Sequence, residues 1–298
     1  MPDSLMTPAA YSAPFDAVAA NYDETFTHSL IGWAQRRATW RELDQAFRPG
    51  QRVLELNCGT GIDAVHLADR GIEVVACDVS PRMIEVARQR LRRTAPRARI
   101  DFRVLATEEI AELHREGPFD GAFSNFAGLN CVQNLPFVAS DLAHLLKPAA
   151  PAVLCFAGRY VGWEALWYLL RRDPRKAFRR LQRGPISARI AEGVSVHVHY
   201  PSVRELARTF APEFRLRHWR GVGVAVPPSY LEPYAMRFQK IMSALEGIDR
   251  MAGRCPLARG LADHALLTFE RTPGTAAVSA ACGQDARAPG SATRNSNV

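Results

Sequence analysis

Two glycines, Gly59 and Gly61, have the residue type and the spacing that are most typical of a ligand-binding turn in this sequence. They follow an apolar run over residues 53–56 and precede residues 62–64, which suit the first turn of a helix. Glycine lets the backbone bend sharply and approach a ligand without an intervening side chain. The first N–H groups of the helix point toward the same place. The pattern predicts a cofactor site at a strand–turn–helix junction, with an ordinary junction of an α/β domain as the alternative.

The acidic residues around the glycine turn help to distinguish between possible cofactors. The glycine pattern, which ends at Ala64, satisfies the dinucleotide fingerprint, and Asp78 follows a second strand at about the ribose-binding spacing of roughly 20 residues. Asp63, however, places a carboxylate at the positive end of the helix dipole that a phosphate would need. Glu55 adds a second acid. We therefore expect a ligand with an ammonium or sulfonium group, and a nicotinamide-dependent oxidoreductase remains an alternative.

The same residues carry a resemblance to a known family. Residues 53–64 resemble the first motif of class I S-adenosylmethionine-dependent methyltransferases. Later segments resemble, in the family's order, the second strand with its ribose-binding acid, the fourth strand with its substrate-facing loop, and the turn before the fifth strand; these are residues 74–83, 119–126 and 145–148. Residues 15–26 are similar to the N-terminal cap helix of the small-molecule branch that includes ubiquinone- and biotin-pathway enzymes. The resemblance covers roughly residues 15–158 well and the remainder in outline.

Alternating strand and helix patterns support an α/β fold of the same kind. Strictly alternating strands and helices imply a mainly parallel sheet covered on both faces. We expect strands at 52–56, 73–77, 100–104, 119–124, 152–157, 214–226 and 265–271, and helices in the regions 13–47, 63–70, 81–93, 107–115, 135–146 and 202–210. The resemblance implies a Rossmann-like doubly wound sheet, mostly parallel with an antiparallel last strand, plus a lid insertion.

The predicted organisation has four parts. N-terminal cap helices occupy residues 1–48, and a methyltransferase core occupies 49–158 and 201–271. Residues 159–200 form the lid insertion. Residues 272–298 are rich in Ala, Gly, Ser and Thr with little to bury, so we expect a disordered tail there.

The resemblance implies roles for the residues that would bind the methyl donor. Glu55, Gly59 and Gly61 would position the methionine portion, Asp78 would accept from both ribose hydroxyls, and Met83 would pack on adenine. Asn125 and Phe126 would form the floor near the methyl group. The full predicted set is Glu55, Asn57, Gly59, Gly61, Asp78, Val79, Met83, Ala106, Thr107, Asn125 and Phe126.

Two positions depart from the family pattern. Asn57 replaces the first motif glycine, and asparagine is at ease with a positive φ angle. Ala106 stands where relatives usually place an aspartate that accepts from the adenine amino group. Adenine recognition would then fall to backbone groups or to Thr107.

Residues for the acceptor side are expected in and near the insertion. Residues 186–190 and 194–200 form a predicted hairpin around Glu192-Gly193, with alternation that places His197 and His199 on one face and the valines on the other. Imidazole titrates near neutral pH, so either histidine could take a proton from the acceptor. The predicted catalytic groups are His197, His199, Asn130 and Tyr22. An edge strand that exposes histidines to water is the alternative. No third ligand accompanies the histidine pair, so we predict no metal site. Further acceptor-pocket candidates are Arg159, Tyr160 and Trp163.

The insertion also carries an apolar patch followed by a basic run. The apolar residues are Trp163, Leu166, Trp167, Leu169 and Leu170, and the basic ones are Arg171, Arg172, Arg175, Lys176, Arg179, Arg180, Arg183 and Arg189. A solvated helical face is one interpretation. An anionic acceptor or carrier protein, or a membrane surface near a lipid substrate, are the others. Nucleic acid is disfavoured because the basic residues come without a binding motif.

Composition fits a soluble enzyme, which we expect in the cytoplasm. With 298 residues and 47% hydrophobic content, the chain can bury one large core. It shows neither a signal-peptide pattern nor an apolar stretch long enough to span a bilayer. Its scattered cysteines lack metal spacing, so we expect reduced thiols. The predicted function is methyl transfer from S-adenosylmethionine to a small, apolar and anionic acceptor, on oxygen or nitrogen, by in-line displacement. A non-catalytic partner protein that binds the same donor is the second alternative.

Overall fold

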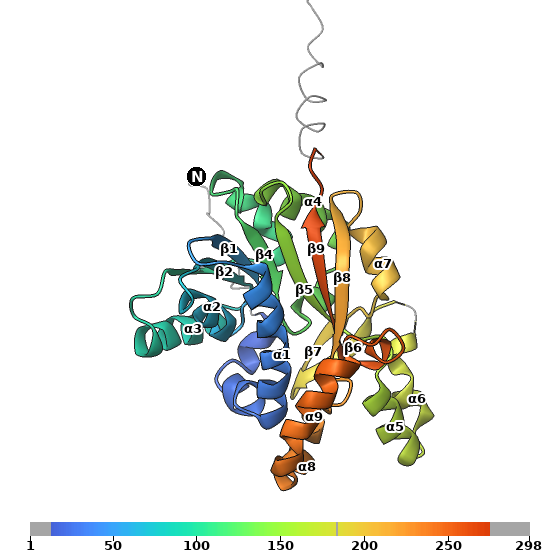
Figure 1. Ribbon diagram of the computed structural model, residues 1–298. Helices are drawn as coiled ribbons and strands as arrows, with labels where there is room; N and C mark the ends of the chain where they lie inside the picture. The colour runs from blue at the N-terminus through green and yellow to red at the C-terminus, as the bar shows by residue number, and fades with distance from the viewer. Residues whose placement is uncertain (1–12, 183, 275–298) are drawn as a thin grey trace, which may run out of the picture.

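A seven-stranded sheet forms the centre of the computed structural model, which describes residues 13–182 and 184–274 (Figure 1). The strand order is β3-β2-β1-β4-β5-β9-β8. The strands are β1 (Arg52–Leu56), β2 (Glu73–Asp78), β3 (Ile100–Val104), β4 (Gly121–Ser124), β5 (Pro151–Ala157), β8 (Phe214–Val222) and β9 (His264–Arg271).

Strand direction confirms the predicted Rossmann-like sheet. The first five strands pair in parallel, whereas β9 is antiparallel to both β5 and β8. The order reverses at β1, which lies between β2 and β4. In open α/β sheets, ligands bind beyond the carboxyl ends of the strands at such a reversal. The topology therefore places a ligand site where β1 ends and the glycine turn begins.

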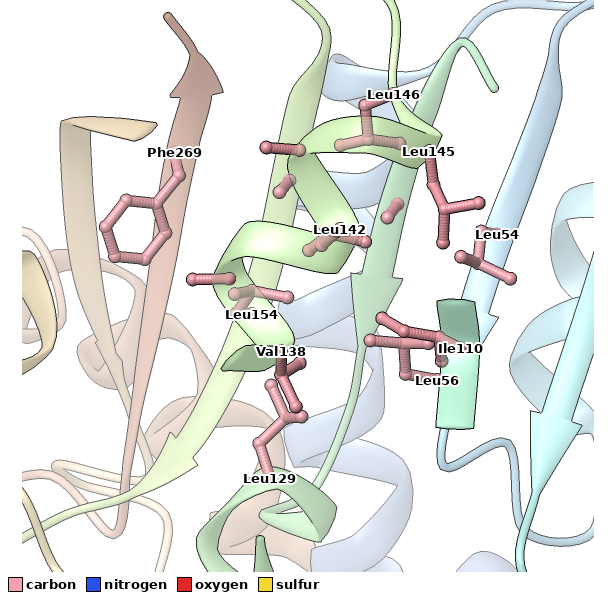
Figure 2. Close-up of a cluster of buried hydrophobic side chains, with 14 of the residues drawn as sticks. Leu54, Leu56, Ile110, Leu129, Val138, Leu142, Leu145, Leu146, Leu154 and Phe269 are labelled. Atoms are coloured by element: carbon pink, nitrogen blue, oxygen red, sulfur yellow. The ribbon is translucent and has the colours of Figure 1, made fainter. Parts of the chain in front are cut away.

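Helices cover both faces of the sheet. Buried side chains of α1 (Leu30–Ala46), α2 (Ile62–Ala68) and α3 (Pro81–Thr94) pack on one face. Those of η3 (Thr107–Arg115), α4 (Leu135–Leu145) and α7 (Val203–Thr209) pack on the other. Figure 2 shows part of this second layer, in which Leu142 of α4 and Ile110 of η3 lie against strand residues such as Leu154 and Leu56. The sheet is buried on both faces, which explains the apolar runs in its strands.

Several elements gather beyond the carboxyl ends of the parallel strands, at the lower end of Figure 1. A two-stranded antiparallel hairpin consists of β6 (Ile186–Ala191) and β7 (Val194–Val198). The helical elements in this part of the molecule are η1 (Pro14–Ala17), η2 (Asp23–Thr27), η4 (Gly128–Cys131), α5 (Gly162–Leu170), α6 (Pro174–Ala177), η5 (Arg179–Leu181), η6 (Ser229–Leu231), α8 (Glu232–Arg237), α9 (Gln239–Ala252) and η7 (Arg259–Leu261). Of these elements, η1, η4, η6 and the hairpin contribute residues to the cavity described below.

The structure corrects the prediction of one helical region over residues 13–47. This region divides into the short elements η1 and η2 and the helix α1. The division occurs because Ser29 is extended, with φ −71° and ψ 154°, and its hydroxyl accepts from the N–H of Gly32. A side chain with this geometry caps a new helix instead of continuing the previous one. Residues 107–115 form a 3-10 helix rather than an α-helix.

The prediction also missed two helices near the C-terminal end of the core. We expected a strand to continue through residue 226, but β8 ends at Val222 and α8 and α9 follow. Asp249 of α9 accepts backbone N–H groups of Gly223, Ala225 and Val226, which holds this segment out of the sheet. The predicted disordered tail begins at Thr272, and its residues 275–298 lie outside the described residues.

Candidate functional site

A cavity of about 500 Å³ lies at the carboxyl ends of β1, β2 and β4. The sheet side contributes the glycine turn, Asp78 and the loop after β4. The opposite side is contributed by the hairpin and by Ser229. The cavity therefore has a wall from the core and a wall from the insertion.

The two glycines of the turn have different roles. Gly59 has a φ of 52°, and a Cβ atom there would meet nothing within 4 Å, so its backbone faces open space in the cavity. Gly61 has a φ of 73°, and a Cβ atom there would lie 2.6 Å from the ring of Phe102. Gly59 thus leaves room for a ligand, whereas Gly61 lets α2 pack closely on β3.

Asp78 lies at the end of β2 and lines the cavity with Val79 and Met83. Its carboxylate accepts from the backbone N–H of Gly59 at 2.8 Å and of Ser80 at 2.9 Å. Burial raises the pKa of Asp78, while these two N–H donors act in the opposite direction. A carboxylate can accept about four hydrogen bonds, so Asp78 retains capacity for ligand hydroxyls.

Asn57 has the left-handed conformation expected of it, with a φ of 56°. Its side-chain amide donates to the hydroxyl of Thr107 at 2.9 Å and accepts from the hydroxyl of Ser124 at 3.2 Å. A Cβ atom on Gly128 would lie 2.4 Å from the Cβ of Asn57, so only glycine fits there. Asn57 therefore connects β1, β4 and η3. Thr107 supports Asn57, and neither Thr107 nor Ala106 is among the residues that line the cavity.

The loop after β4 contributes a polar group and a ring to the cavity. Phe126 and Ala127 have positive φ angles of 51° and 66°, conformations that cost energy in residues other than glycine. Both polar atoms of the Asn125 side chain are buried and lack a hydrogen-bond partner among the described residues. Asn125 and Phe126 both line the cavity. An unpaired buried amide beside a cavity is a candidate ligand contact.

The structure corrects the electrostatic argument for a cationic ligand. Arg36 of α1 forms an ion pair with Asp63 at 2.5 Å, and the indole N–H of Trp40 donates to the same carboxylate at 2.6 Å. Glu55 is buried outside the lining of the cavity, and burial, followed by the charge of Asp63, raises its pKa well above its usual range. Neither acid presents an uncompensated negative charge. The glycine turn and Asp78, rather than Asp63 and Glu55, are the evidence for a methyl-donor site here.

Arg36 is a cavity residue that the sequence analysis missed. Its guanidinium lies over the rings of Phe126, at 4.7 Å, and Phe26, at 5.8 Å. The side chain is buried, and its Nε atom has no partner among the described residues. An arginine inside a helix has no distinctive sequence pattern, so only the fold reveals that α1 directs Arg36 to the glycine turn.

The hairpin presents its apolar face to the cavity. Ala188 and Ile190 of β6, Val196 and Val198 of β7, and the following Tyr200 line it. His197 is exposed on the other face, and His199 lies outside the lining as well. The predicted alternation agrees with the structure, but it directs the two predicted catalytic histidines away from the cavity. We therefore do not retain His197 and His199 as acceptor-side bases.

Asn130 has a supporting position rather than a place in the cavity lining. Its amide donates to the carbonyl of His199 at 2.6 Å and accepts from the N–H of Ala157 at 2.9 Å. Its backbone carbonyl accepts from the N–H of His199 at 2.8 Å. Asn130 thus joins the hairpin to the end of β5.

Of the other acceptor-side candidates, only Tyr22 lines the cavity. Asp23 accepts from the hydroxyl of Thr60 at 2.7 Å and fixes this segment beside the turn. Burial raises the pKa of Tyr22 to about 12. Arg159 pairs with Glu205, Tyr160 is exposed, and Trp163 donates to the carbonyl of Ala225; these three lie elsewhere.

Comparison with known proteins decides the type of domain. Residues 53–149 match the family model of a methyltransferase domain. These residues form a methyltransferase domain. The match includes β1 to β4 and the loop that carries Asn125 and Phe126, and so the sheet side of the cavity. The predicted resemblance to class I S-adenosylmethionine-dependent methyltransferases is confirmed for this part of the chain.

Curated relatives extend the likeness. A demethylmenaquinone methyltransferase from Clavibacter sepedonicus is 34% identical over 155 residues, which are 51% of this chain and 60% of that protein. A ubiquinone biosynthesis O-methyltransferase from Xylella fastidiosa is 30% identical over 154 residues, with 46% and 61% coverage. The methyltransferase domain and its flanks thus span about 60% of the length of these relatives.

A solved structure shows the same fold. A SAM-dependent methyltransferase from Methanosarcina mazei superposes with a TM-score of 0.53 at 16% identity, covering 77% of this chain and 96% of that one.

No helix in the described part of the chain has both the length and the apolarity that crossing a membrane requires. Within residues 13–182 and 184–274, no group of three or more His, Cys, Asp or Glu could hold a metal ion.

Proposed function

We propose that this chain transfers a methyl group from S-adenosylmethionine to an apolar small molecule held between the glycine turn and the β6–β7 hairpin. The observation that carries the proposal is the two-sided cavity, in which a polar wall faces an apolar one. Such a combination suits a polar donor and an apolar acceptor in contact. Holding both reactants in one water-poor cavity supplies most of what an in-line displacement needs.

The polar wall suits the donor. Asp78 has acceptor capacity for the ribose hydroxyls beside Gly59, and Met83 and Val79 offer apolar contact to a purine. Arg36 has a buried Nε atom without a partner, which suits the carboxylate of the methionine portion. The donor supplies an electrophilic methyl carbon on sulfur when bound.

The apolar wall suits an acceptor ring. Ile190, Val196 and Val198 offer only carbon atoms from their side chains, and Tyr200 and Ser229 add hydroxyl groups. A ring compound of the quinone pathways named for the relatives would fit this chemistry. The acceptor atom is oxygen or nitrogen in our proposal, and its lone pair forms the new bond to carbon as the carbon–sulfur bond breaks.

The described lining holds no group suited to act as a strong base at neutral pH. The raised pKa of Tyr22, about 12, keeps its phenol protonated, and Asp63 is paired with Arg36. We infer that the acceptor loses its proton to water, before or after transfer. This favours an acidic hydroxyl group or an unprotonated amine. A cytoplasmic location stays a prediction.

Substitution in the apolar wall tests the proposal. Val196→Asp places a charge in the acceptor half of the cavity, whereas His197→Asp places the same charge on the outer face of the same strand. Incubation with labelled donor and extract of the producing cell, with product identification by mass, gives the transfer rate. We expect Val196→Asp to lower this rate by about tenfold or more, because a buried unpaired charge is strongly disfavoured, with donor affinity unchanged. His197→Asp should retain the rate.

The outcomes separate the alternatives. Equal rates for the two variants would contradict the placement of the acceptor under the hairpin. Donor binding without any labelled product would favour the non-catalytic partner protein. Binding of NADH in place of the methyl donor would favour the oxidoreductase.

A further inference from the structure

Helices α5 and α8 present apolar side chains to solvent on neighbouring surfaces. Leu166 and Leu170 of α5 are 52% and 74% exposed, and Tyr234 of α8 and the following Phe238 are 51% and 53% exposed. Leu166 and Leu170 are four residues apart in α5, so they lie side by side on its face, whereas Phe238 directly follows the last residue of α8. The two helices are adjacent, because the rings of Trp167 and Tyr234 lie 5.3 Å apart.

Uncompensated cations border these apolar residues. Arg171 lies over the ring of Trp167 at 4.0 Å, and Arg172 follows it. Arg237, the last residue of α8, immediately precedes Phe238. All three are exposed, and none forms an ion pair with another described residue. We call Leu166, Leu170, Tyr234, Phe238 and these three arginines the α5–α8 surface.

Two other basic residues of the insertion, Arg179 and Arg180, are already used within the protein. Arg179 and Arg180 pair with the buried Glu164 at 2.8 and 2.7 Å, and Arg180 also reaches Asp263 at 3.4 Å. Within the described residues, the basic run therefore has an internal part, Arg179 and Arg180, and an exposed part that includes Arg171 and Arg172. Arg171 and Arg172 border the apolar residues of α5.

The position of the α5–α8 surface relates it to the candidate site. Both lie beyond the carboxyl ends of the parallel strands, and α5 and α8 project at that end of the molecule (Figure 1). Ser229 lines the cavity, and the next residue, Tyr230, lies 6.4 Å from Tyr168 of α5 between ring centroids. The segment that leads into α8 thus begins at a residue of the cavity lining, Ser229, so the α5–α8 surface is connected to one wall of the cavity.

We propose that the α5–α8 surface binds anionic lipid membranes. Exposed aliphatic and aromatic side chains enter the boundary between headgroups and acyl chains, and flanking arginines attract anionic headgroups. Exposed apolar side chains bordered by arginines without ion-pair partners among the described residues are the combination that binds at an anionic bilayer surface. This inference does not depend on which acceptor is methylated.

Vesicle co-sedimentation tests the proposal with the full chain. We expect the protein to sediment with vesicles of equal parts phosphatidylcholine and phosphatidylglycerol, and to remain in solution with phosphatidylcholine alone or at high salt. Arg171→Glu with Arg172→Glu should lower the partition coefficient by about tenfold or more, and Leu170→Ser with Phe238→Ser should lower it several-fold.

Matched controls lie on other faces of the molecule. Arg92→Glu with Arg93→Glu changes two exposed arginines of α3, and Phe137→Ser changes a 70% exposed ring on α4. Both should leave sedimentation unchanged, and thermal melting should show that every variant folds. Absence of sedimentation, equal binding to neutral vesicles, or equal losses in the controls would overturn the proposal. Donor binding is measured separately, so failure here leaves the proposed function intact.

Discussion

Asn57 and Gly128 share one small volume beside the candidate donor site. In the family pattern a glycine stands at the first of these positions, so the space next to the turn is ordinarily less filled. Here the Asn57 side chain fills it and connects to Thr107 and Ser124. Gly128 leaves no Cβ atom in the way. We interpret the pair as one packing solution, in which the departure at position 57 requires glycine at position 128.

A double-mutant cycle tests this interpretation. Gly128→Ala should lower the free energy of unfolding by about 1–3 kcal/mol, because the added methyl group meets Asn57 at less than contact distance. Asn57→Gly removes the obstacle, so adding Gly128→Ala to that variant should cost much less. Urea unfolding of the four proteins measures the coupling. Additive losses would show that the two residues are independent.

Glu55 provides a pH-dependent test at the same scale. Its raised pKa means that the folded chain keeps a proton which the unfolded chain has lost above the ordinary value of 4.5. The free energy of unfolding therefore falls as pH rises from this ordinary value toward the raised one. Glu55→Gln removes the ionisation and nearly keeps the shape. We expect the melting temperature of the variant to fall less between about pH 5 and about pH 8 than that of the parent protein.

The control for this experiment is Glu108→Gln, which changes an exposed glutamate in the first turn of η3. Its melting temperatures should follow those of the parent protein. Parallel curves for the parent protein and Glu55→Gln would show that Glu55 does not titrate as its burial requires.

At the scale of elements, the β6–β7 hairpin depends on few contacts with the core. Asn130 supplies three hydrogen bonds between the loop after β4, the end of β5 and the residue after β7. Asn130 is fully buried. If its side chain were removed, water could not reach the groups that it pairs with, and they would lose their hydrogen bonds. We infer that Asn130 fixes how the apolar face of the hairpin meets the cavity.

Asn130→Ala should therefore destabilise the protein by about 2–4 kcal/mol, since each buried group left unpaired costs about 1–3 kcal/mol. Gln133→Ala, at an exposed position of the same loop, should change the free energy of unfolding by no more than about 0.5 kcal/mol. Chemical denaturation measures both. A loss for Asn130→Ala as small as that of the control would argue against its role as an anchor.

The elements also show how far the sequence could predict this structure. The parallel strands, the glycine turn and the hairpin follow from local patterns, and all are present. The direction in which the hairpin faces was wrong, because alternation defines two faces without saying which one meets the core. Arg36 and the two helices after Val222 were missed because long-range contacts, with Asp63 and Asp249, determine their positions.

For the whole molecule, the insertion is joined to the core through charge. Glu164 of α5 and Asp263, the residue before β9, both contact Arg180, whose guanidinium lies over Tyr200 at 5.1 Å. Tyr200 in turn lines the cavity. The basic insertion thus combines a structural connection to the sheet, through Arg180, with exposed arginines that remain available for a partner.

The central claim is that the cavity beyond β1, β2 and β4 binds S-adenosylmethionine through Asp78. Isothermal titration with the product S-adenosylhomocysteine tests it most directly, in the parent protein, in Asp78→Asn, and in Asp69→Asn as a control at an exposed aspartate. We predict binding at one site in the parent protein and the control, and affinity at least about tenfold weaker in Asp78→Asn, because a charged acceptor is lost. No binding by the parent protein, or equal affinity in Asp78→Asn, would contradict the claim.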